Sequence, residues 1–339
     1  MFKSKKLKAL FAVIMMITVT AVFCACSLEK FNSGKKSGEF INIGTMNLVN
    51  GDLIAQYEKW YEEELGMKAR VFYFQSGKDI IAALESGTID IGEVGNSPAA
   101  RAISNGLNIR VIFIGDIIGA AETLAARNDS GVSSVKDLVG KKVATPFEST
   151  AHFSLMNSLK LEGISDKDIF LIDLDPEDIL AYWQRGHIDA AYVWYPVLGK
   201  LLENGKSIIN SEKLADEGII SADLFVVRSS FEEKNSGVVK KFVELQLRAN
   251  DIILKEPQRA AKEISAILSI SEKDAAEQIT KFKYLPADEQ IHYLNDSIAE
   301  NLKDTADFLA KQGSIKKAAS LKDFESRVTA EFVKSVSVE

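Results

Sequence analysis

Cysteine is nearly absent from this chain of 339 residues. The two cysteines, Cys24 and Cys26, lie near the N-terminus, and none follows them. A disulfide within the rest of the chain is therefore excluded. Histidine is also rare, and His152, His187 and His292 lie far apart in the sequence. Because scattered histidines with no nearby cysteine are not typical of a metal site, we expect no metal and no cofactor.

Catalytic motifs and an excess of positive charge are missing as well. The sequence has no Gly-x-Ser-x-Gly elbow and no His-Glu-x-x-His zinc motif. Its 41 Lys and Arg residues stand against 48 Asp and Glu residues, a formal net charge of −7. An acidic chain of this kind is not expected to bind nucleic acid. With 46% hydrophobic residues, it can bury one or two full cores.

The N-terminus has the pattern of an export signal. Four lysines within the first eight residues precede an apolar run from Ala9 to Phe23, which is too short for a comfortable membrane span. The segment Phe23-Cys-Ala-Cys-Ser27 resembles a bacterial lipobox, so we expect residues 1–25 to be a signal peptide and Cys26 to be lipidated. Their removal takes away four lysines and no acid, which changes the formal net charge from −7 to −11. An ordinary signal peptide cut nearby is the alternative.

The segment after the predicted lipidation site is polar. Residues 26–38 are rich in Ser, Gly and Lys and have no periodic apolar pattern. This composition predicts a flexible tether between a lipid and a folded domain. We therefore expect an exported protein, anchored by its lipid to the outer face of the cytoplasmic membrane or located in the periplasm.

Two stretches of the chain repeat one pattern. Ala82–Pro98 and Ala181–Pro196 each run from a helix end through Gly, Ile-Asp and an apolar strand to small or aromatic residues and Pro. Each Gly stands where a helix needs a left-handed cap, and each apolar run is short enough to be a buried strand. Two such units predict two similar α/β lobes with a ligand cleft between them.

Strands alternate with helices along the chain as far as Asn210, which predicts a mostly parallel sheet flanked by helices in each lobe. Ser221–Val227 is predicted to be a strand that returns to the first lobe. The later segments are helical and are expected to pack on that lobe. Asp52–Leu65 and Pro286–Lys311 each predict one helix. The sequence thus predicts a discontinuous lobe 1, residues 39–117 and 224–335, and a lobe 2 of residues 118–223.

Polar residues follow two predicted strands where ligands of open α/β sheets lie, beyond the carboxyl ends of the strands. Asn96 and Ser97 follow one strand, and Ser149, Thr150 and His152 follow another. Amides and hydroxyls at two helix N-termini can bind one anion without Lys or Arg. The alternative is that these Ser and Thr residues cap their helices. His152 is expected to donate a hydrogen bond or to pack.

Acidic and aromatic residues complete the predicted pocket. Glu93 lies beside the first polar turn, while Glu122 and Asp223 lie where the chain crosses between the lobes. A carboxylate at such a place can bind a ligand ammonium group, although a solvated or cap-pairing acid is the alternative. Tyr192 and Trp194 share one face of a strand, and a ring there can cover a cation or a methylene chain, or pack in the core. An anion subsite and a cation subsite together predict a zwitterion.

Several segments together resemble the taurine-binding proteins of bacterial ABC importers. The resemblance runs from about Ile41 to the C-terminus. It is carried by Ser76-Gly77, Ala83–Gly92, Ser97-Pro98, Pro146–His152, Trp183–Asp189, Ala191–Trp194, Asp223 and Val226–Arg228. A looser similarity extends to alkanesulfonate- and nitrate-binding proteins. The resemblance implies a two-lobed type II periplasmic-binding-protein fold, which closes on taurine and delivers it to a permease and an ATPase.

The resemblance also implies roles for individual residues. It implies that the sulfonate binds at Ser97, Ser149 and Thr150, with His152 nearby. It further implies that Asp223, with Glu122, binds the ammonium group and that Trp194 lines the pocket. The sequence departs from the family at Glu93, where a neutral amide is usual, at Asn96, where Ser is usual, and in the loop that contains Asn47.

We therefore predict a monomeric, non-enzymatic solute-binding protein for taurine or a close aliphatic sulfonate. A second hypothesis is another small anion or a heterocycle, such as an alkanesulfonate, nitrate, an aromatic sulfonate or a pyrimidine precursor. A third is an enzyme built on the same fold, which would need a titratable catalytic set in the cleft.

Overall fold

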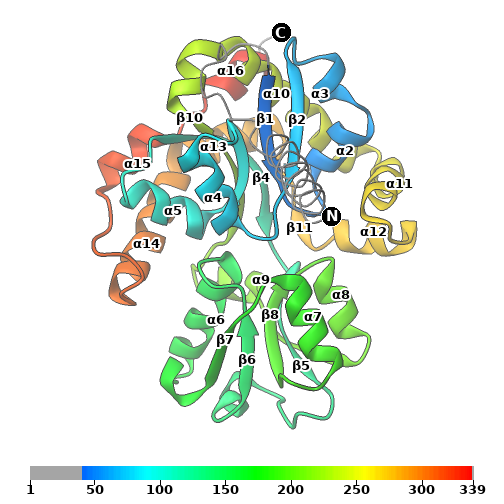
Figure 1. The fold of residues 1–339 in the computed structure, drawn as a ribbon, viewed down its shortest axis with the longest axis vertical. Coiled ribbons are helices and arrows are strands. Elements are labelled where there is room, and N and C mark those ends of the chain that lie inside the picture. The colour runs from blue at the N-terminus through cyan, green and yellow to red at the C-terminus, as the bar shows by residue number, and fades with distance from the viewer. Residues whose placement is uncertain (1–39, 338–339) are drawn as a thin grey trace, which may run out of the picture. The chain divides into compact units, whose positions relative to one another are not determined.

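The structure is a computed structural model that describes residues 40–337. The predicted signal peptide, the lipidation site Cys26 and the tether lie outside the described residues. Two β-sheets, each covered by helices, form two lobes (Figure 1), which confirms the predicted α/β class and two-lobed architecture. The lobe boundaries at residues 117/118 and 223/224 stay a prediction. Within residues 40–337, no helix is long and apolar enough to cross a membrane.

The sheet of the first lobe has six strands. Strand β1 is parallel to β2 and β3, whereas β10 is antiparallel to both of its neighbours, β3 and β4. The strands, in spatial order, are β11 (Phe282–Lys283), β4 (Ile109–Ile118), β10 (Ala222–Arg228), β3 (Ile91–Gly95), β1 (Phe40–Thr45) and β2 (Lys68–Tyr73).

The sheet of the second lobe has five strands and repeats this topology. Strand β6 is parallel to β7 and β8, and β5 is antiparallel to β8 and β9. The order β7-β6-β8-β5-β9 therefore matches β2-β1-β3-β10-β4 of the first sheet in position and direction. The strands are β7 (Phe170–Asp173), β6 (Lys142–Thr145), β8 (Ala190–Trp194), β5 (Glu122–Arg127) and β9 (Gly205–Asn210).

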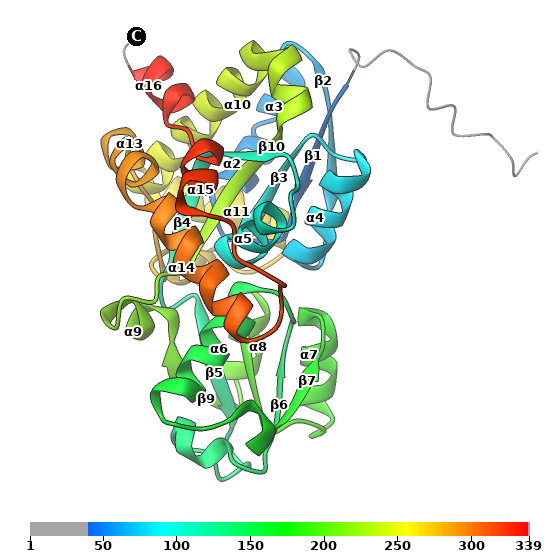
Figure 2. The same cartoon turned by 90° about the vertical axis from the view of Figure 1, so that its left-hand side faces the viewer.

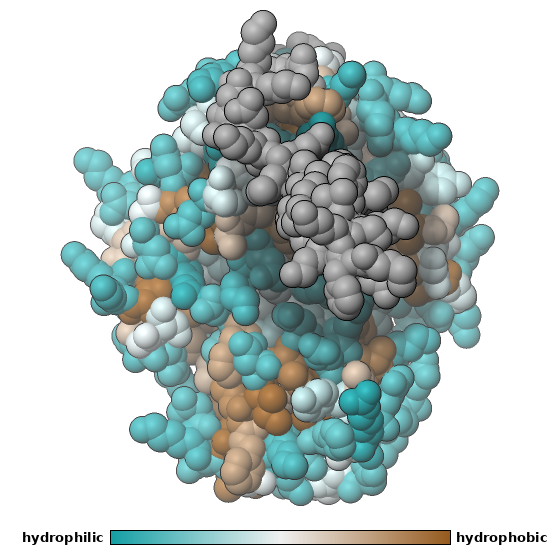
Figure 3. Space-filling view, in the orientation of Figure 1, coloured by the Kyte–Doolittle hydropathy of each residue, from teal (hydrophilic) through white to brown (hydrophobic). Residues whose placement is uncertain are grey.

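Helices cover both sheets (Figures 1 and 2). The first lobe carries α2 (Gly51–Tyr57), α3 (Trp60–Glu63), α4 (Gly77–Ser86), α5 (Asn96–Ser104), α10 (Ser229–Lys255), α11 (Pro257–Leu268), α12 (Glu272–Ile279), α13 (Ala287–Asp296), α14 (Ile298–Lys311), α15 (Leu321–Arg327) and α16 (Glu331–Ser337). The second carries α6 (Thr150–Leu161), α7 (Pro176–Gln184), α8 (Val197–Leu202) and α9 (Ser211–Asp216), with short 3-10 turns at Val135–Leu138 and Asp166–Asp168. Hydrophilic side chains cover most of the face seen in Figure 3, and apolar ones gather on the second lobe.

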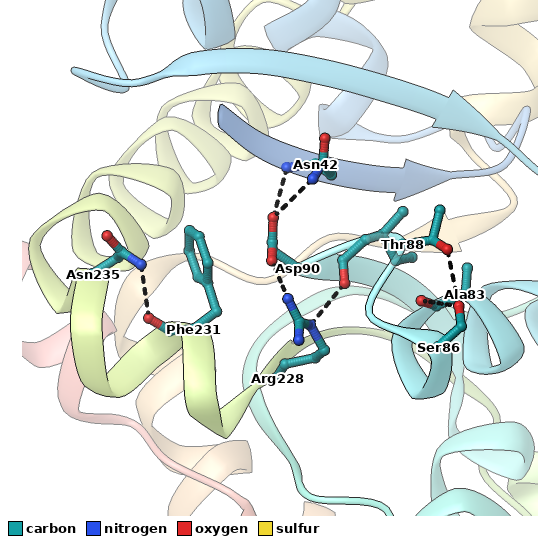
Figure 4. A network of polar contacts seen from close by, with 9 residues as sticks. Asn42, Ala83, Ser86, Thr88, Asp90, Arg228, Phe231 and Asn235 are labelled. Carbon is teal, nitrogen blue, oxygen red and sulfur yellow. Dashed lines mark hydrogen bonds and ion pairs between the residues drawn. The ribbon is translucent and has the colours of Figure 1, made fainter. Parts of the chain in front are cut away.

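The repeated sequence pattern joins three strands of the first lobe (Figure 4). Gly87 ends α4 in the left-handed conformation, with φ of +76°. Asp90 then accepts hydrogen bonds from the backbone N–H of Asn42 at 2.9 Å and from its side-chain amide at 3.3 Å. Arg228, at the end of β10, pairs with Asp90 and donates to the carbonyl of Ile89 at 2.9 Å. The Ile-Asp pair therefore ties β1, β3 and β10 together.

The second copy of the pattern does the same in the other lobe. Gly186 has φ of +71°. Asp189 accepts a hydrogen bond from the backbone N–H of Lys142, at the start of β6, at 2.8 Å. The backbone N–H of Arg127, at the end of β5, donates to the carbonyl of Asp189 at 3.0 Å, as that of Arg228 does to Asp90. The Gly and Ile-Asp part of each copy therefore has a structural role in its sheet.

Two helices predicted as continuous are broken. The segment predicted as Asp52–Leu65 forms α2 and α3, separated at Lys59, which has φ of +59°. The segment predicted as Pro286–Lys311 forms α13 and α14, separated at Ser297. The short strand β11 was not predicted, because it is defined only by its pairing with Ile117 and Ile118 of β4.

Candidate functional site

A small cavity lies between the two lobes. Its volume is about 20 Å³, which is room for about one water molecule. Five of the predicted site residues line it: Glu122, Ser149, Thr150, Trp194 and Asp223. The remaining lining residues were not predicted, and they are Met46, Leu48, Gly77, Gly95, Pro98, Ile118 and Phe282. The lining thus combines carboxylates, hydroxyls and apolar groups from both lobes.

The lobes touch each other at this cavity. A Cβ atom added at Gly95 would lie 2.5 Å from Cγ2 of Thr150, which is closer than real Cβ contacts. The two residues stand at the N-termini of α5 and α6, so these helix starts face each other. At the edge of the cleft, Arg101 of α5 pairs with Glu148, in the loop before α6. Both contacts join the first lobe to the second, so the cleft between the lobes is closed in this structure.

Glu122 begins β5 and is almost completely buried in the cleft. Its carboxylate accepts hydrogen bonds from the hydroxyls of Thr150, Ser154 at 3.0 Å and Ser211 at 2.8 Å. Burial raises the pKa of Glu122, and these three hydrogen bonds oppose the rise because they stabilise the charged form. The hydroxyls therefore hold Glu122 in a fixed orientation on the wall of the second lobe.

Asp223 is in β10 and faces the cavity from the first lobe. Its side chain is only 5% exposed, and its carboxylate accepts no hydrogen bond from any residue between 40 and 337. Burial, and then the nearby charge of Glu122, raise the pKa of Asp223 to about 7. Asp223 is thus an acceptor available to a cationic ligand group.

Asp116 is a site residue that sequence reasoning missed. It lies in β4 directly opposite Asp223 in β10, and both of its carboxylate oxygens are buried without a hydrogen-bond partner in the described part of the chain. Burial, followed by the charges of Asp223 and Glu122, raises its pKa well above the usual range. The sequence signal that could have identified Asp116 is its place just after the apolar run Ile109–Ile114. An acid that continues a buried strand is costly to bury, which suggests a functional role.

Glu93 lies in β3, on the other side of β10 from Asp116. One of its oxygens accepts a hydrogen bond from the side-chain amide of Asn50 at 2.5 Å, and the other has no partner within residues 40–337. Burial, followed by the charges of Asp52, Asp223 and Asp116, raises its pKa well above the usual range. Glu93 does not line the cavity, but it belongs to the same group of buried acids.

The predicted anion-binding residues differ in their surroundings. Ser149 is the N-cap of α6, where its hydroxyl accepts from the N–H of His152 at 3.1 Å and donates to the carbonyl of Pro146 at 2.5 Å. Ser97 does not line the cavity and is buried in the first turn of α5, whose N-cap is Gly95, so its role in ligand binding stays a prediction. The capping alternative thus describes Ser149 but not Ser97.

Four other predicted residues do not line the cavity. Asn47 is exposed. Asn96 donates to Asn301 at 2.8 Å and so joins α5 to α14. His152 stacks on Phe147, with ring centroids 4.6 Å apart, and burial lowers its pKa. Tyr192 lies in the apolar cluster on one face of the second sheet. Any role of these four residues in ligand binding stays a prediction.

A cation subsite is the chemistry that this arrangement supports. Asp223 lines the cavity, while Asp116 and Glu93 lie on the strands on either side of it and do not line the cavity. All three have oxygens that accept no hydrogen bond from residues 40–337. No Lys, Arg or His residue is among the residues 40–337 that line the cavity. Within that same part of the chain, no group of three or more His, Cys, Asp or Glu residues has the geometry to hold a metal ion. An organic cation therefore fits this end of the cavity better than a metal.

Comparison with known proteins gives a consistent result. A model of the NMT1/THI5-like family matches residues 48–260. The chain is 34% identical to the taurine-binding periplasmic protein of Escherichia coli over 287 residues, which cover 83% of this chain and 88% of that protein.

The fold is also similar to that of solved structures. The periplasmic aliphatic sulphonate-binding protein SsuA from Escherichia coli is 21% identical, with a TM-score of 0.72 over 88% of this chain and 100% of that one. The desulfurization enzyme DSZB is 15% identical, with a TM-score of 0.64 over 88% of this chain and 99% of that one. The fold alone thus accommodates both binding proteins and an enzyme.

Proposed function

Because the chain belongs to the NMT1/THI5-like family, we propose that it is the extracytoplasmic solute-binding component of an ABC importer. It captures taurine or a close aliphatic sulfonate by closure of its lobes and delivers it to a permease and an ATPase. The observation that carries this proposal is the interlobe cavity, which Asp223 lines on one side and the α6 N-terminus on the other.

The two ends of an aminosulfonate match the two sides of this cavity. The helix starts at Gly95 and Thr150 offer backbone N–H groups and positive dipole ends to the sulfonate. Asp223 offers unpaired carboxylate oxygens to the ammonium group. Trp194 covers the short carbon chain between them. Each hydrogen bond to a charged group contributes roughly 1.5–3 kcal/mol.

The cavity favours binding over catalysis. His152, a candidate general base, packs on Phe147 instead of lining the cavity. The lining provided by residues 40–337 includes no histidine or cysteine that could act as base or nucleophile. We propose in addition that residues 1–25 direct export and that Cys26 carries the lipid anchor of a monomeric protein.

Isothermal titration calorimetry of the purified protein tests this proposal. We expect taurine to bind and ethanesulfonate, which lacks the amine, to bind more weakly. Asp223→Ala should weaken taurine at least tenfold and should change ethanesulfonate little, because only taurine has an ammonium group. Absence of taurine binding, together with binding of nitrate or a pyrimidine, would replace the sulfonate proposal with the second hypothesis.

A further inference from the structure

The acids in and next to the cavity have more acceptor oxygens than residues 40–337 supply with donors. Among residues 40–337, both oxygens of Asp116 and Oε2 of Glu93 have no hydrogen-bond partner, and both side chains are fully buried. The two oxygens of Asp223 also accept no hydrogen bond from residues 40–337. Five carboxylate oxygens are thus unpaired. Unpaired buried polar atoms are costly, so a group this large needs an explanation.

The strand register places Asp116 and Glu93 on the same face of the sheet as residues that line the cavity. Residues two positions apart in a strand share one face. Asp116 stands two residues before Ile118, and Glu93 stands two residues before Gly95. Both Ile118 and Gly95 line the cavity. Asp223, which also lines it, pairs with Gly95 on one side and with Asp116 on the other. Asp116 and Glu93 therefore form a second layer of acids next to Asp223.

The number of donors distinguishes the cationic groups that could occupy this place. A primary ammonium has three N–H donors, whereas a singly substituted guanidinium has five in a planar fork. A guanidinium also forms two parallel hydrogen bonds with one carboxylate. An ammonium seated on Asp223 would leave the second layer unpaired. A guanidinium seated on Asp223 has N–H donors left for Asp116, which stands directly opposite Asp223 in the neighbouring strand.

We propose that the preferred ligand is a short guanidino-alkanesulfonate, with its guanidinium on Asp223 and Asp116 and with Glu93 behind them. The inference rests on the proposed function, since the sulfonate end is taken from it. It adds Asp116 and Glu93 as the residues that determine specificity at the cationic end. It also accounts for an acid at position 93 in a pocket for an anion, because the acid lies at the opposite end of the ligand.

Protonation supports this assignment. Burial raises the pKa values of Asp116 and Glu93 well above the usual range, which favours the protonated form of both carboxyls in the free site. A bound guanidinium stabilises the charged carboxylates and therefore releases these protons. Calorimetry in buffers of different ionisation enthalpy measures the number released. We expect a larger release with the guanidino ligand than with taurine.

The decisive experiment is calorimetry of the purified protein with 2-guanidinoethanesulfonate, taurine and ethanesulfonate. We expect the guanidino compound to bind at least tenfold more tightly than taurine. Asp116→Asn should reduce this preference to about threefold or less. Glu263→Gln is the matched control, because Glu263 is a buried carboxylate with one oxygen that has no partner among residues 40–337. It lies on α11, outside the strands that carry the acid layer and outside the cavity lining. The control should keep the full preference.

The outcomes separate the inference from the function. Equal or tighter binding of taurine by the native chain would overturn the guanidino assignment and leave the proposed function standing. Binding of none of the three sulfonates would overturn both. If Asp116→Asn still binds the guanidino compound at least tenfold more tightly than taurine, Asp116 does not determine this specificity. If Asp116→Asn yields too little folded protein, Glu93→Gln makes the same test, and a full preference there would also count against the acid layer.

Discussion

At the scale of single residues, Gly95 sets how closely the lobes approach. Its backbone φ of −63° suits any residue, so Gly95→Ala introduces no backbone strain. The added methyl would nevertheless lie 2.5 Å from Cγ2 of Thr150. We expect Gly95→Ala to weaken ligand binding about tenfold or more, which matches an overpacking cost of roughly 1–3 kcal/mol in the closed state only. Calorimetry with taurine, compared between the variant and the unmodified protein, measures this loss of affinity.

A second substitution, at Thr150, should relieve this clash and restore ligand binding. Thr150→Ser removes Cγ2 and keeps the hydroxyl that donates to Glu122. The double variant Gly95→Ala, Thr150→Ser should therefore recover most of the lost affinity, while Thr150→Ser alone should have a small effect. A thermal unfolding curve for Gly95→Ala should resemble that of the native chain. A large loss of stability would mean that the residue acts within its own lobe instead.

Asp223 makes stability depend on pH. Its pKa is raised to about 7 in the folded protein, from 3.8. The folded state therefore binds more protons than the unfolded state between about pH 4 and 7, and stability falls as pH rises through this window. Asp223→Asn removes the titrating group. We expect the variant to be more stable than the native chain at pH 8, by on the order of 2–4 kcal/mol, and the gain to shrink toward pH 5.

Urea unfolding of the ligand-free protein at pH 5 and pH 8 checks this expectation. Asp178→Asn, which removes an exposed carboxylate on α7, controls for a change of one charge. The charge of Glu122 raises the pKa of Asp223. The charge of Asp223 in turn raises the pKa values of Asp116 and Glu93. A gain of equal size at both pH values would show that Asp223 is ionised throughout.

At the scale of elements, the two repeated turns are expected to respond alike to mutation. Gly87 and Gly186 both cap helices with positive φ. Gly87→Ala and Gly186→Ala should each lower the free energy of unfolding by about 1–2 kcal/mol, because other L-residues are strained there. Gly237→Ala is the control, since Gly237 lies inside α10 with open space around it and without positive φ. It should instead stabilise by about 0.5–1 kcal/mol. Denaturant titration measures whether each substitution lowers or raises the free energy of unfolding.

These turns also show why part of the structure could be predicted from the sequence. Gly87 and Gly186 are local signals, because a left-handed cap and the short apolar strand after it are written in consecutive residues. The same holds for the alternation of strands and helices and for the polar residues at the start of α6. The paired lobes follow from finding this signal twice.

The unpredicted parts depend on contacts between distant segments. The importance of Asp116 comes from its position opposite Asp223, and Phe282 reaches the cavity only through the pairing of β11 with β4. Neither contact leaves a local pattern. The break between α13 and α14 at Ser297 likewise has no Gly or Pro to mark it. Sequence reasoning therefore located the cleft better than the full set of residues that line it.

At the scale of the whole molecule, the cavity is too small for a sulfonate to enter without a change of conformation. Its volume of about 20 Å³ holds about one water molecule. A ligand therefore needs the lobes to separate, which breaks the contact between Arg101 and Glu148 at the cleft edge. We expect a variant with Arg101→Cys and Glu148→Cys, joined by a short cleavable thiol cross-linker without ligand, to lose binding until the linker is cleaved.

Single-cysteine variants control for reaction at Cys24 and Cys26. Cross-linking after the ligand has been added should instead retain it during dialysis. Binding by the cross-linked, ligand-free protein would show that the ligand enters by another route. In that case, the ion pair between Arg101 and Glu148 would not report on closure.

The placement of the aromatic residues has one further consequence. The chain has three tryptophans, and Trp60 and Trp183 are buried in the two lobes while Trp194 lines the cavity. Intrinsic fluorescence therefore contains one signal from the cleft above a constant background from the cores. The emission maximum should shift when the cleft fills, and Trp194→Phe should abolish that shift. The kinetics of capture could thus be followed by stopped flow without any dye attached to the protein.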